Sequence, residues 1–501
     1  MYAQIHSATL LGTQGYPIVI EAHIGKGIPG FTIVGLPDES CRESRDRVRA
    51  ALLSSGLPWP NRKVTINLVG LGERKGGAAL DLAIAVALLV AQEVIPQAAL
   101  DDRAFLGELG LDGTLRHTTG ITPLVMSVAE REVVVALADA SEAAMVQPRM
   151  LRVATTLQEV VECLLGESVW PDAPDVNIAA NGVIVPDLSD VRGQDFARRA
   201  LEIAAAGHHH ILMMGSPGSG KSMLAKRMPG ILPPLTQPEA LSAAIVRSAA
   251  GVPATELVSH VPPFRAPHHS VSMVAMVGGG TAHMRPGEVS LASGGVLFLD
   301  EMGEFAPTVL DALRQPLEDG VVRVARARGA VTMPARFILI GASNPCPCGE
   351  MNPQLCTCAP SMTQRYLRRF SGPLLDRFDI RVVMERPSVE ALVDNTPAES
   401  SYVVAQRVLR AREVAYARQG CVNADMSPED LDKFAPLSAL AKEKLHDVLS
   451  KGELSGRGYH RVRRVARTIA DVNGAPDVLH VDHVIAALQM RHNIMSRLAM
   501  L

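Results

Sequence analysis

The feature that most constrains this chain is the segment "GSPGSGKS", a full match to the pattern G-x-x-x-x-G-K-[ST]. An apolar stretch, Ile211–Met214, precedes the segment, and a helical pattern, "SMLAKRM", follows its lysine. Glycines at such a turn let backbone N–H groups converge on phosphate oxygens, and the start of the helix adds a favourable dipole. The segment predicts a nucleotide-binding loop made of Gly215, Ser216, Pro217, Gly218, Ser219, Gly220, Lys221 and Ser222.

Polar side chains at two later strand ends complete the expected site. We expect Lys221 to reach the β- and γ-phosphates of ATP and Ser222 to hold Mg²⁺. The strand "GGVLFLDE" ends in Asp300 and Glu301, which can orient hydrated Mg²⁺ and polarise the attacking water. A solvated acidic strand end is the alternative for this pair, and the phosphate loop argues against it. Asn344 ends the strand "RFILIGASN" and is well placed to fix the water.

The chain divides by pattern into four parts. Its 501 residues are 47% hydrophobic and 20% charged, which predicts a soluble protein of roughly three domains. Residues 1–165 alternate β-like runs with helices and predict an α+β domain, and residues 166–184 predict a linker rich in Pro, Asp and Gly. Residues 185–386 repeat strand, loop and helix with apolar strands, typical of a parallel sheet covered on both faces. Residues 387–501 predict a helical domain.

Charge and apolar runs restrict location and partners. The N-terminus has no basic segment followed by an apolar one, so it does not predict a signal peptide. The longest apolar run, Leu82–Ala91, is about half of the ~20 residues that span a bilayer. Three scattered cysteines suit a reducing compartment, so we expect a cytoplasmic protein that does not contact a membrane. The net charge of −3 excludes whole-chain basicity but not a local basic surface.

Two long segments carry a family resemblance. "VPPFRAPHHSVSMVAMVGGGTAHMRPGEVSLASGGVLFLDE" and "LDALRQPLEDGVVRVARARGAVTMPARFILIGASNPCPCG" look like the magnesium-chelatase-like branch of the AAA+ ATPases. Within that branch the whole chain resembles the ComM/YifB family, from "GIPGFTIVGLPDESCRESRDRVRAALLSSG" to "GRGYHRVRRVARTIADV". The resemblance implies a multidomain α/β protein: a ribosomal-S5-like, Lon-protease-like α+β N-terminal domain, an AAA+ P-loop parallel-sheet core and a C-terminal helical lid.

The resemblance also implies an arginine that acts between subunits. In this family the segment "SGPLLDRFD" carries an arginine finger, here Arg377, which would reach the nucleotide held by a neighbouring subunit. Arginine suits this role because its charge is permanent and its fork matches phosphate oxygens. Arg365, Arg368 and Arg369 lie close by in the sequence and are competing candidates.

Two further segments are assigned through the resemblance. "SGRGYHR" resembles the sensor-2 motif of the lid, with Arg457 as the best match, and Arg461 lies four residues on. "DVRGQDFARRALEIAAAG" resembles the segment that borders the adenine, with Val191 and Gln194 nearest the base.

An arginine finger between subunits implies a ring, and similar proteins are homohexamers. The hairpin "DGVVRVARARGAVTMPARF" would then face the central pore with Arg323, Arg326 and Arg328. On a regular strand Arg326 and Arg328 share one face, and Arg323 points to the other. Arginines repeated around a ring can track the phosphate backbone of single-stranded or branched DNA. A solvated hairpin face is the alternative, because charged residues are common on edge strands.

The first domain lacks the chemistry of a Lon-type protease. The turn that would hold the serine, Arg74–Ala85, contains no Ser, Thr or Cys. The segment "GTLRHTTGITPLV", which should hold the lysine base, contains no lysine, and none occurs between Lys75 and Lys221. A Ser–Lys dyad needs both partners. We therefore expect no proteolysis, and a domain that serves assembly or substrate binding.

Four of the seven cysteines are concentrated in "NPCPCGEMNPQLCTC". Four thiolates this close can form a tetrahedral structural zinc site. C-x-C is tighter than the usual C-x₂₋₄-C spacing, so a cysteine-bearing loop without metal stays open as the alternative. The candidate ligands are Cys346, Cys348, Cys356 and Cys358.

Two functions remain in competition at this point. The resemblance favours a hexameric, ATP-driven DNA helicase or branch-migration translocase acting in recombination or natural transformation. The alternative is an ATP-dependent remodeller of a protein partner, like a magnesium-chelatase motor subunit, because the core motifs report only ATP chemistry. Stimulation of ATP hydrolysis by DNA, weakened by salt, separates the two.

Overall fold

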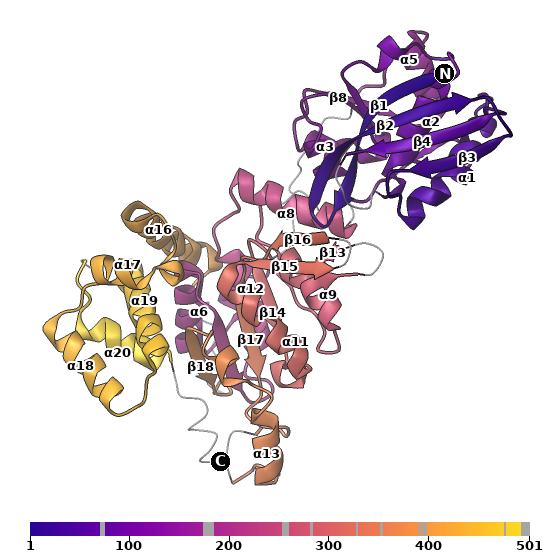
Figure 1. The fold of residues 1–501 in the computed structure, drawn as a ribbon. Helices are drawn as coiled ribbons and strands as arrows, with labels where there is room; N and C mark the ends of the chain where they lie inside the picture. The colour runs from indigo at the N-terminus through magenta and orange to yellow at the C-terminus, as the bar shows by residue number, and fades with distance from the viewer. Residues whose placement is uncertain are drawn as a thin grey trace.

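The structure is a computed structural model. It describes residues 1–70, 76–173, 185–252, 260–280, 284–326, 329–350, 354–388, 390, 393, 398–474 and 477–491. Most of the predicted linker, residues 174–184, lies outside this set. No helix in the described part of the chain is both long and apolar enough to cross a bilayer. Figure 1 shows a first sheet near the N-terminus, a second sheet in the middle and a group of helices at the C-terminal side.

The first sheet is mixed and has seven strands in the order β3-β4-β2-β1-β5-β8-β9. Burial alternates along β2 and β4, so one face of the sheet packs on a core and the other does not. The strands are β1 (Tyr2–Leu11), β2 (Gln14–Gly25), β3 (Gly30–Val34), β4 (Lys63–Val69), β5 (Arg103–Phe105), β8 (Glu132–Ala136) and β9 (Met150–Ala154). A small hairpin adds β6 (Glu108–Leu109) and β7 (Leu115–Arg116).

Helix α2 (Asp81–Ala91) forms the centre of this core. All of its residues are buried, as expected for a helix that is apolar on every side. It packs on β1, β2 and α1. The helices of this region are α1 (Glu39–Ser54), α2, α3 (Ile121–Met126), α4 (Ala140–Ala144) and α5 (Leu157–Leu165).

The second sheet is parallel, which confirms the predicted α/β class. Its strand order is β11-β14-β17-β10-β18, and every neighbouring pair is parallel. Three central strands are buried at every residue, because helices cover both faces. The strands are β10 (Ile211–Gly215), β11 (Phe264–Arg265), β14 (Val296–Leu299), β17 (Ile338–Ser343) and β18 (Ile380–Met384).

Helices and two hairpins surround the second sheet. The helices are α6 (Asp195–Gly207), α7 (Lys221–Ala225), α8 (Gln237–Ala250), α9 (Met273–Val277), α10 (Glu288–Leu291), α11 (Pro307–Ala312), α12 (Arg314–Asp319), α13 (Pro360–Leu367) and α14 (Gly372–Leu375). The hairpins are β12 (Gly278–Gly279) with β13 (Arg285–Pro286), and β15 (Val321–Arg326) with β16 (Gly329–Pro334).

The first region touches the second at α8 and at the hairpin β15–β16 (Figure 1). The Gly120 amide donates to the Ser248 carbonyl over 3.0 Å. At Gly12, in the turn between β1 and β2, an added Cβ would lie only 2.2 Å from Val331 Cγ1. The β1–β2 turn is therefore packed directly on the hairpin.

The C-terminal part is helical, as expected. Helix α19 packs on α6 of the second sheet and on α16 and α20, and buried His209 lies 2.8 Å from Thr468 of α19. The helices are α16 (Ser401–Gln419), α17 (Pro428–Phe434), α18 (Ala439–Ser450), α19 (Gly456–Val472) and α20 (Val481–Gln489).

Candidate functional site

The phosphate loop connects β10 to α7 in the predicted way. Gly218 and Gly220 have φ of 80° and 91°, a left-handed conformation that favours glycine. Gly215 has a different requirement, since an added Cβ would lie 2.3 Å from the Met384 carbonyl oxygen at the end of β18. The glycines therefore shape a tight turn whose backbone lies close to a neighbouring strand.

Lys221 begins α7 and folds back over the loop. Its Nζ donates to the carbonyls of Gly215 (2.7 Å) and Ser216 (3.0 Å) and to Asn344 Oδ1 (3.3 Å). Burial lowers the pKa of Lys221, and the carboxylates of Asp300 and Glu301 act in the opposite direction. The contact with Asn344 joins the end of β17 to the phosphate loop, the location that the sequence predicts for this side chain.

Ser222 and Asp300 form the second contact of the loop. Ser222 Oγ donates to Asp300 Oδ2 over 2.7 Å, so α7 and the end of β14 share one polar position. A hydroxyl and a carboxylate are the hard oxygen donors that Mg²⁺ prefers, usually with several waters retained. These two residues therefore suit a Mg²⁺ ion that arrives with a nucleotide.

Glu301 has a strained backbone. Its φ is 48°, in the left-handed region, and its amide donates to Asp300 Oδ1 over 3.0 Å. Such a conformation costs about 1–3 kcal/mol and occurs often at functional sites. The sharp turn leaves the Glu301 side chain exposed, where His269 Nδ1 lies 3.8 Å from its Oε2.

The two residues expected beside the adenine have different surroundings. Val191 is buried in the core under the second sheet. Gln194 Nε2 donates to the Ser219 carbonyl (3.0 Å) and to the Glu385 carbonyl (2.7 Å). Gln194 thus links the phosphate loop to the segment after β18, whereas Val191 is part of the apolar core.

Arg377 is engaged within its own chain. It is almost fully buried, its guanidinium bonds Glu318 of α12, and Nη1 donates to the Pro373 carbonyl over 2.6 Å. Of the competing candidates, Arg369 donates to Glu304 Oε2 over 2.9 Å, and Arg365 and Arg368 are exposed on and just after α13.

In the lid, Arg457 is exposed in the first turn of α19. Arg461, one turn on, donates to Asp379 Oδ1 over 2.5 Å and to the Arg377 carbonyl over 3.1 Å. Burial alone would raise the pKa of Asp379, but Arg461 and His209 hold it well below its usual range. Arg461 therefore ties the lid to the segment that carries Arg377.

Of the three hairpin arginines, Arg323 is the one whose side chain the structure describes. Arg323 is exposed and pairs with Asp319 over 2.5 Å. β15 ends at Arg326, and Arg328 lies outside the described residues. The prediction that Arg326 and Arg328 share one face of the strand therefore stays a prediction.

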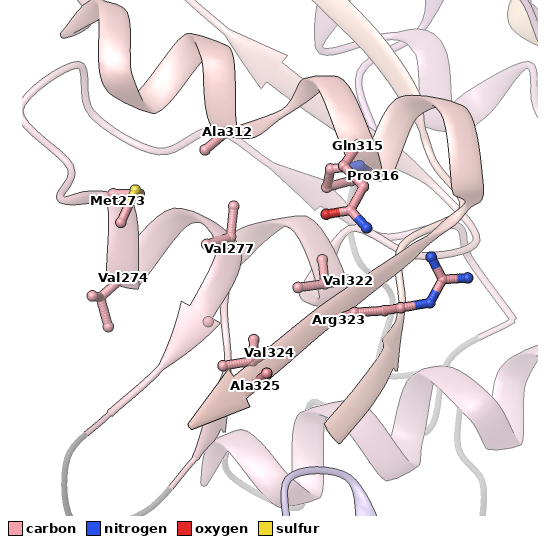
Figure 2. A pocket seen from close by; sticks show the side chains of 11 residues that line it. Met273, Val274, Val277, Ala312, Gln315, Pro316, Val322, Arg323, Val324 and Ala325 are labelled. Carbon is pink, nitrogen blue, oxygen red and sulfur yellow. The ribbon is translucent and has the colours of Figure 1, made fainter. Parts of the chain in front are cut away.

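A pocket of about 310 Å³ lies between the hairpin and α9. Val322 and Val324 point toward Val277, and Arg323 extends to the other side of the strand (Figure 2). The residues that line the pocket are mostly apolar, and they include the exposed Met273. The pocket contains none of the phosphate-loop residues, so it is a separate feature, formed by α9, the end of α11, α12 and β15.

The start of α2, in the segment expected to hold a protease serine, contains a salt bridge. Arg47 donates to both oxygens of buried Asp81, over 2.6 and 3.1 Å. Gly76 is held by Thr9 Oγ1 through hydrogen bonds of 2.9 and 3.1 Å. Arg74 and Lys75 lie outside the described residues.

The four predicted zinc ligands come together. The sulfurs of Cys346, Cys348, Cys356 and Cys358 all lie within 4.8 Å of one another. A backbone amide hydrogen bond from Glu350 is the main cause that lowers the pKa of Cys348 to about 6.

His269 is the site residue whose position the sequence did not indicate. The pair His268–His269 offers no metal-ligand spacing, and its neighbour Glu301 is remote in sequence. The order of parallel strands is the signal that could have found it. β11 lies next to β14, so residues that follow the two strands meet at one edge of the sheet.

Three family models match consecutive parts of the chain. Magnesium chelatase, subunit ChlI, matches residues 187–392. Subunit ChlI of Mg-chelatase matches residues 20–139, and the model of the ChlI C-terminal part matches residues 398–491.

Similar proteins extend over nearly the full length. The uncharacterised protein YifB of Escherichia coli is 41% identical over 493 residues, which cover 97% of this chain and 96% of that protein. Competence protein ComM of Haemophilus influenzae is 40% identical over 501 residues, covering 98% and 97%. A shorter match, to the probable DNA helicase MCM9 of Arabidopsis thaliana, is 25% identical over 269 residues, 52% of this chain and 34% of that one. The chain belongs to the ComM/YifB family of magnesium-chelatase-like AAA+ proteins.

Proposed function

We propose that this protein binds ATP with Mg²⁺ and hydrolyses it to drive movement on DNA. One observation carries the ATPase part. Lys221, Ser222, Asp300 and Asn344 meet at the carboxyl ends of three adjacent parallel strands, joined by hydrogen bonds of 2.7 and 3.3 Å. Ligands of open α/β sheets bind at this edge.

Each residue has a distinct role in this proposal. Lys221 exchanges its carbonyl partners for phosphate oxygens, which are stronger acceptors because they are charged. Ser222 and Asp300 hold Mg²⁺, which neutralises charge on the phosphates when it is bound with ATP. Glu301 polarises the attacking water and accepts its proton, and Asn344 orients that water.

Arg377 acts as the arginine finger toward a neighbouring subunit of a homohexameric ring. In the isolated chain its guanidinium is held by Glu318, so the finger must leave this pair when a subunit docks. The exchange is reasonable because the guanidinium fork of arginine matches phosphate oxygens as well as carboxylate oxygens, and a phosphate carries more negative charge than the Glu318 carboxylate. Arg457 of the lid acts on the nucleotide of its own subunit.

The DNA part of the proposal rests on the hairpin. Arg323 is exposed, and its surface pair with Asp319 is of a kind that contributes at most about 1 kcal/mol, so a DNA phosphate can replace it. Arg326 and Arg328 follow in the sequence toward the hairpin tip. The relatives named competence protein and probable DNA helicase add support. We propose single-stranded or branched DNA as the substrate, as in branch migration during recombination or natural transformation.

A remodeller of a protein partner is the second candidate. All three matching family models are named for a magnesium-chelatase subunit. In this case the apolar pocket beside the hairpin would hold a protein side chain, and DNA would not change the rate of ATP hydrolysis.

The deciding experiment is steady-state ATP hydrolysis without DNA and with single-stranded, duplex and four-way-junction DNA, at two salt concentrations. We expect stimulation by single strands or junctions that weakens as salt rises. Arg323→Gln should reduce the stimulation and leave DNA-free hydrolysis unchanged, and Arg410→Gln, on exposed α16 surface, is the matched control. A rate that no DNA changes would favour the protein remodeller.

The ring is tested by mixing two inactive variants. Arg377→Ala should bind nucleotide but hydrolyse it poorly, and Lys221→Ala should not bind it tightly. Hydrolysis that returns on mixing indicates that Arg377 acts between subunits, and Arg410→Ala, exposed on α16, provides the control. Full hydrolysis by Arg377→Ala alone would exclude the finger.

A further inference from the structure

The segment between β17 and α13 gathers four thiols. Cys346 Sγ lies 3.2 Å from Cys348 Sγ and 3.7 Å from Cys356 Sγ, and the last two are 3.5 Å apart. These separations are far longer than the ~2.05 Å of a disulfide, and all four cysteines are free thiols. The group is thus a set of unlinked sulfurs turned toward one point.

The spacing of the sulfurs matches one tetrahedral ion. Four sulfurs at ~2.3 Å from a Zn²⁺ ion stand about 3.8 Å from one another. The separations of 3.7 and 3.5 Å are close to this value, the third is shorter at 3.2 Å, and no pair of the four exceeds 4.8 Å. The Cys348 amide also donates to Cys358 Sγ over 3.3 Å, the kind of outer contact that orients a metal-bound thiolate.

We propose that Cys346, Cys348, Cys356 and Cys358 bind one structural Zn²⁺ ion. Four protein ligands leave no open coordination position, so the ion has no catalytic role. The first C-x-C pair places its two sulfurs 3.2 Å apart across a short turn. The Gly349 amide closes this turn by donating to the Cys346 carbonyl over 3.0 Å.

We call the segment 346–358 the zinc loop, and one of its ends lies against the nucleotide site. Asn344 precedes Cys346 by two residues. Gly349 has φ of 79°, and a Cβ added there would lie 2.7 Å from Pro217 Cδ in the phosphate loop. The zinc loop therefore forms part of the wall that positions both Asn344 and the phosphate loop.

The other end returns to the same strand. Cys358 precedes α13, whose Tyr366 hydroxyl lies 3.0 Å from Ser343 Oγ, next to Asn344. Gly303, two residues after Glu301, packs so closely on the Tyr366 ring that an added Cβ would lie 2.3 Å from the hydroxyl. Zn²⁺ would fasten the loop where both of its ends contact the nucleotide site. This consequence for ATP rests on the proposed function; the metal site does not.

Metal analysis of the full-length protein tests the site. Protein purified without chelator or added metal is assayed for zinc and iron by mass spectrometry of the elements, and we expect about one zinc ion per chain. Cys348→Ser and Cys356→Ser should lose the zinc, and Cys421→Ser, outside the cluster, should keep it. Co²⁺ exchanged into the parental protein should give the absorption of a tetrahedral thiolate site, a readout that requires no variant to fold.

Three results would overturn the proposal. The first is a parental protein that contains no zinc and takes none from a competing chromophoric chelator. The second is a protein that contains iron in place of zinc. The third is zinc that persists in both cluster variants. If zinc is present, its removal should slow ATP hydrolysis by about 10-fold or more, since 1 Å of misplacement can cost ~100-fold. Zinc without any ATPase activity would refute only the proposed function, and ATPase activity without zinc would refute only the metal site.

Discussion

Two glycine-rich turns each begin a helix that packs on a sheet, and their charges differ. The turn before α2 leads to Asp81, a carboxylate at a helix start, where it suits the helix dipole. Arg47 pairs with it inside the same domain. The turn before α7 leads to Lys221, a cation at a helix start, where the dipole opposes it.

The comparison shows what separates a structural turn from a binding turn. At α2 the carboxylate of Asp81 is paired with Arg47 of the same chain, so the turn presents no unpaired charge to a ligand. At α7 the hydrogen-bond acceptors of the ammonium in the described part of the chain are neutral carbonyl, hydroxyl and amide oxygens. The carboxylates of Asp300 and Glu301 attract the ammonium without forming an ion pair with it, so a bound anion would improve its environment. Glycine alone does not predict phosphate binding, and a lysine at a helix start that forms no ion pair in the described part of the chain is the more informative signal.

The largest effect is expected at the binding turn. Lys221→Ala should abolish tight ATP binding, because it removes the cation that faces the β- and γ-phosphates. A fluorescent nucleotide titration measures this directly. Lys226→Ala, an exposed lysine five residues on, should bind as the parental protein does. Equal nucleotide affinity in the two variants would contradict the role of the turn.

Glu301→Gln should separate binding from turnover. We expect unchanged nucleotide affinity and hydrolysis slower by about 10²–10⁴-fold, the usual contribution of a general base. Single-turnover hydrolysis checks the rate, and Glu304→Gln, in the turn that follows, is the neighbouring control. Hydrolysis at the parental rate in Glu301→Gln would assign water activation to another residue.

The elements of this site that the sequence predicts are those with local patterns. The apolar strands β10, β14 and β17 and the residues directly after them follow from runs of a few letters. Strand β1 alternates exposed and buried residues only in its first half, so its sequence carries a weaker pattern. Its pairing with β2 therefore became known only from the structure.

Pairs between distant segments left no such pattern. Nothing near Arg377 indicates that Glu318 holds it, because a single arginine in a sequence carries no information about its partner. The contact of His269 with Glu301 depends on the strand order, and the packing of Gly12 on Val331 depends on how two regions meet. The four cysteines are the exception, since their short spacing predicted a cluster that the fold brings together.

The structural turn gives a smaller effect, on stability. Asp81→Ala should lower the free energy of unfolding by about 3 kcal/mol, because it leaves the largely buried Arg47 without its partner. Chemical denaturation followed by circular dichroism measures the loss. Asp46→Ala, on exposed surface of α1, should change stability little. If Asp81→Ala were as stable as Asp46→Ala, the charge balance at α2 would not hold that turn together.

The smallest effect concerns a second buried carboxylate of the N-terminal region, Glu142, which pairs with no arginine in the described part of the chain. Glu142 of α4 accepts a hydrogen bond from Ser248 of α8 over 2.9 Å, and its other oxygen has no partner in the described part of the chain. Burial raises the pKa of Glu142 to about 7, although Ser248 and His117 act in the opposite direction. The folded state therefore binds this proton more tightly than the unfolded state, whose carboxyl titrates near pH 4.5.

The sign of the pH dependence follows from this shift. Protonated Glu142 contributes to the free energy of unfolding. This contribution is complete below pH 4.5 and is lost as the pH rises through about 7, which is opposite to the usual behaviour of a paired carboxylate. Glu142→Gln keeps a neutral side chain at every pH, so it should stabilise the protein above pH 7 by roughly 1–3 kcal/mol and have little effect near pH 5. Thermal unfolding at both pH values measures this, with exposed Glu130→Gln as the control. A stability gain that is equal at the two pH values would show that ionisation of Glu142 does not weaken the contact between α4 and α8.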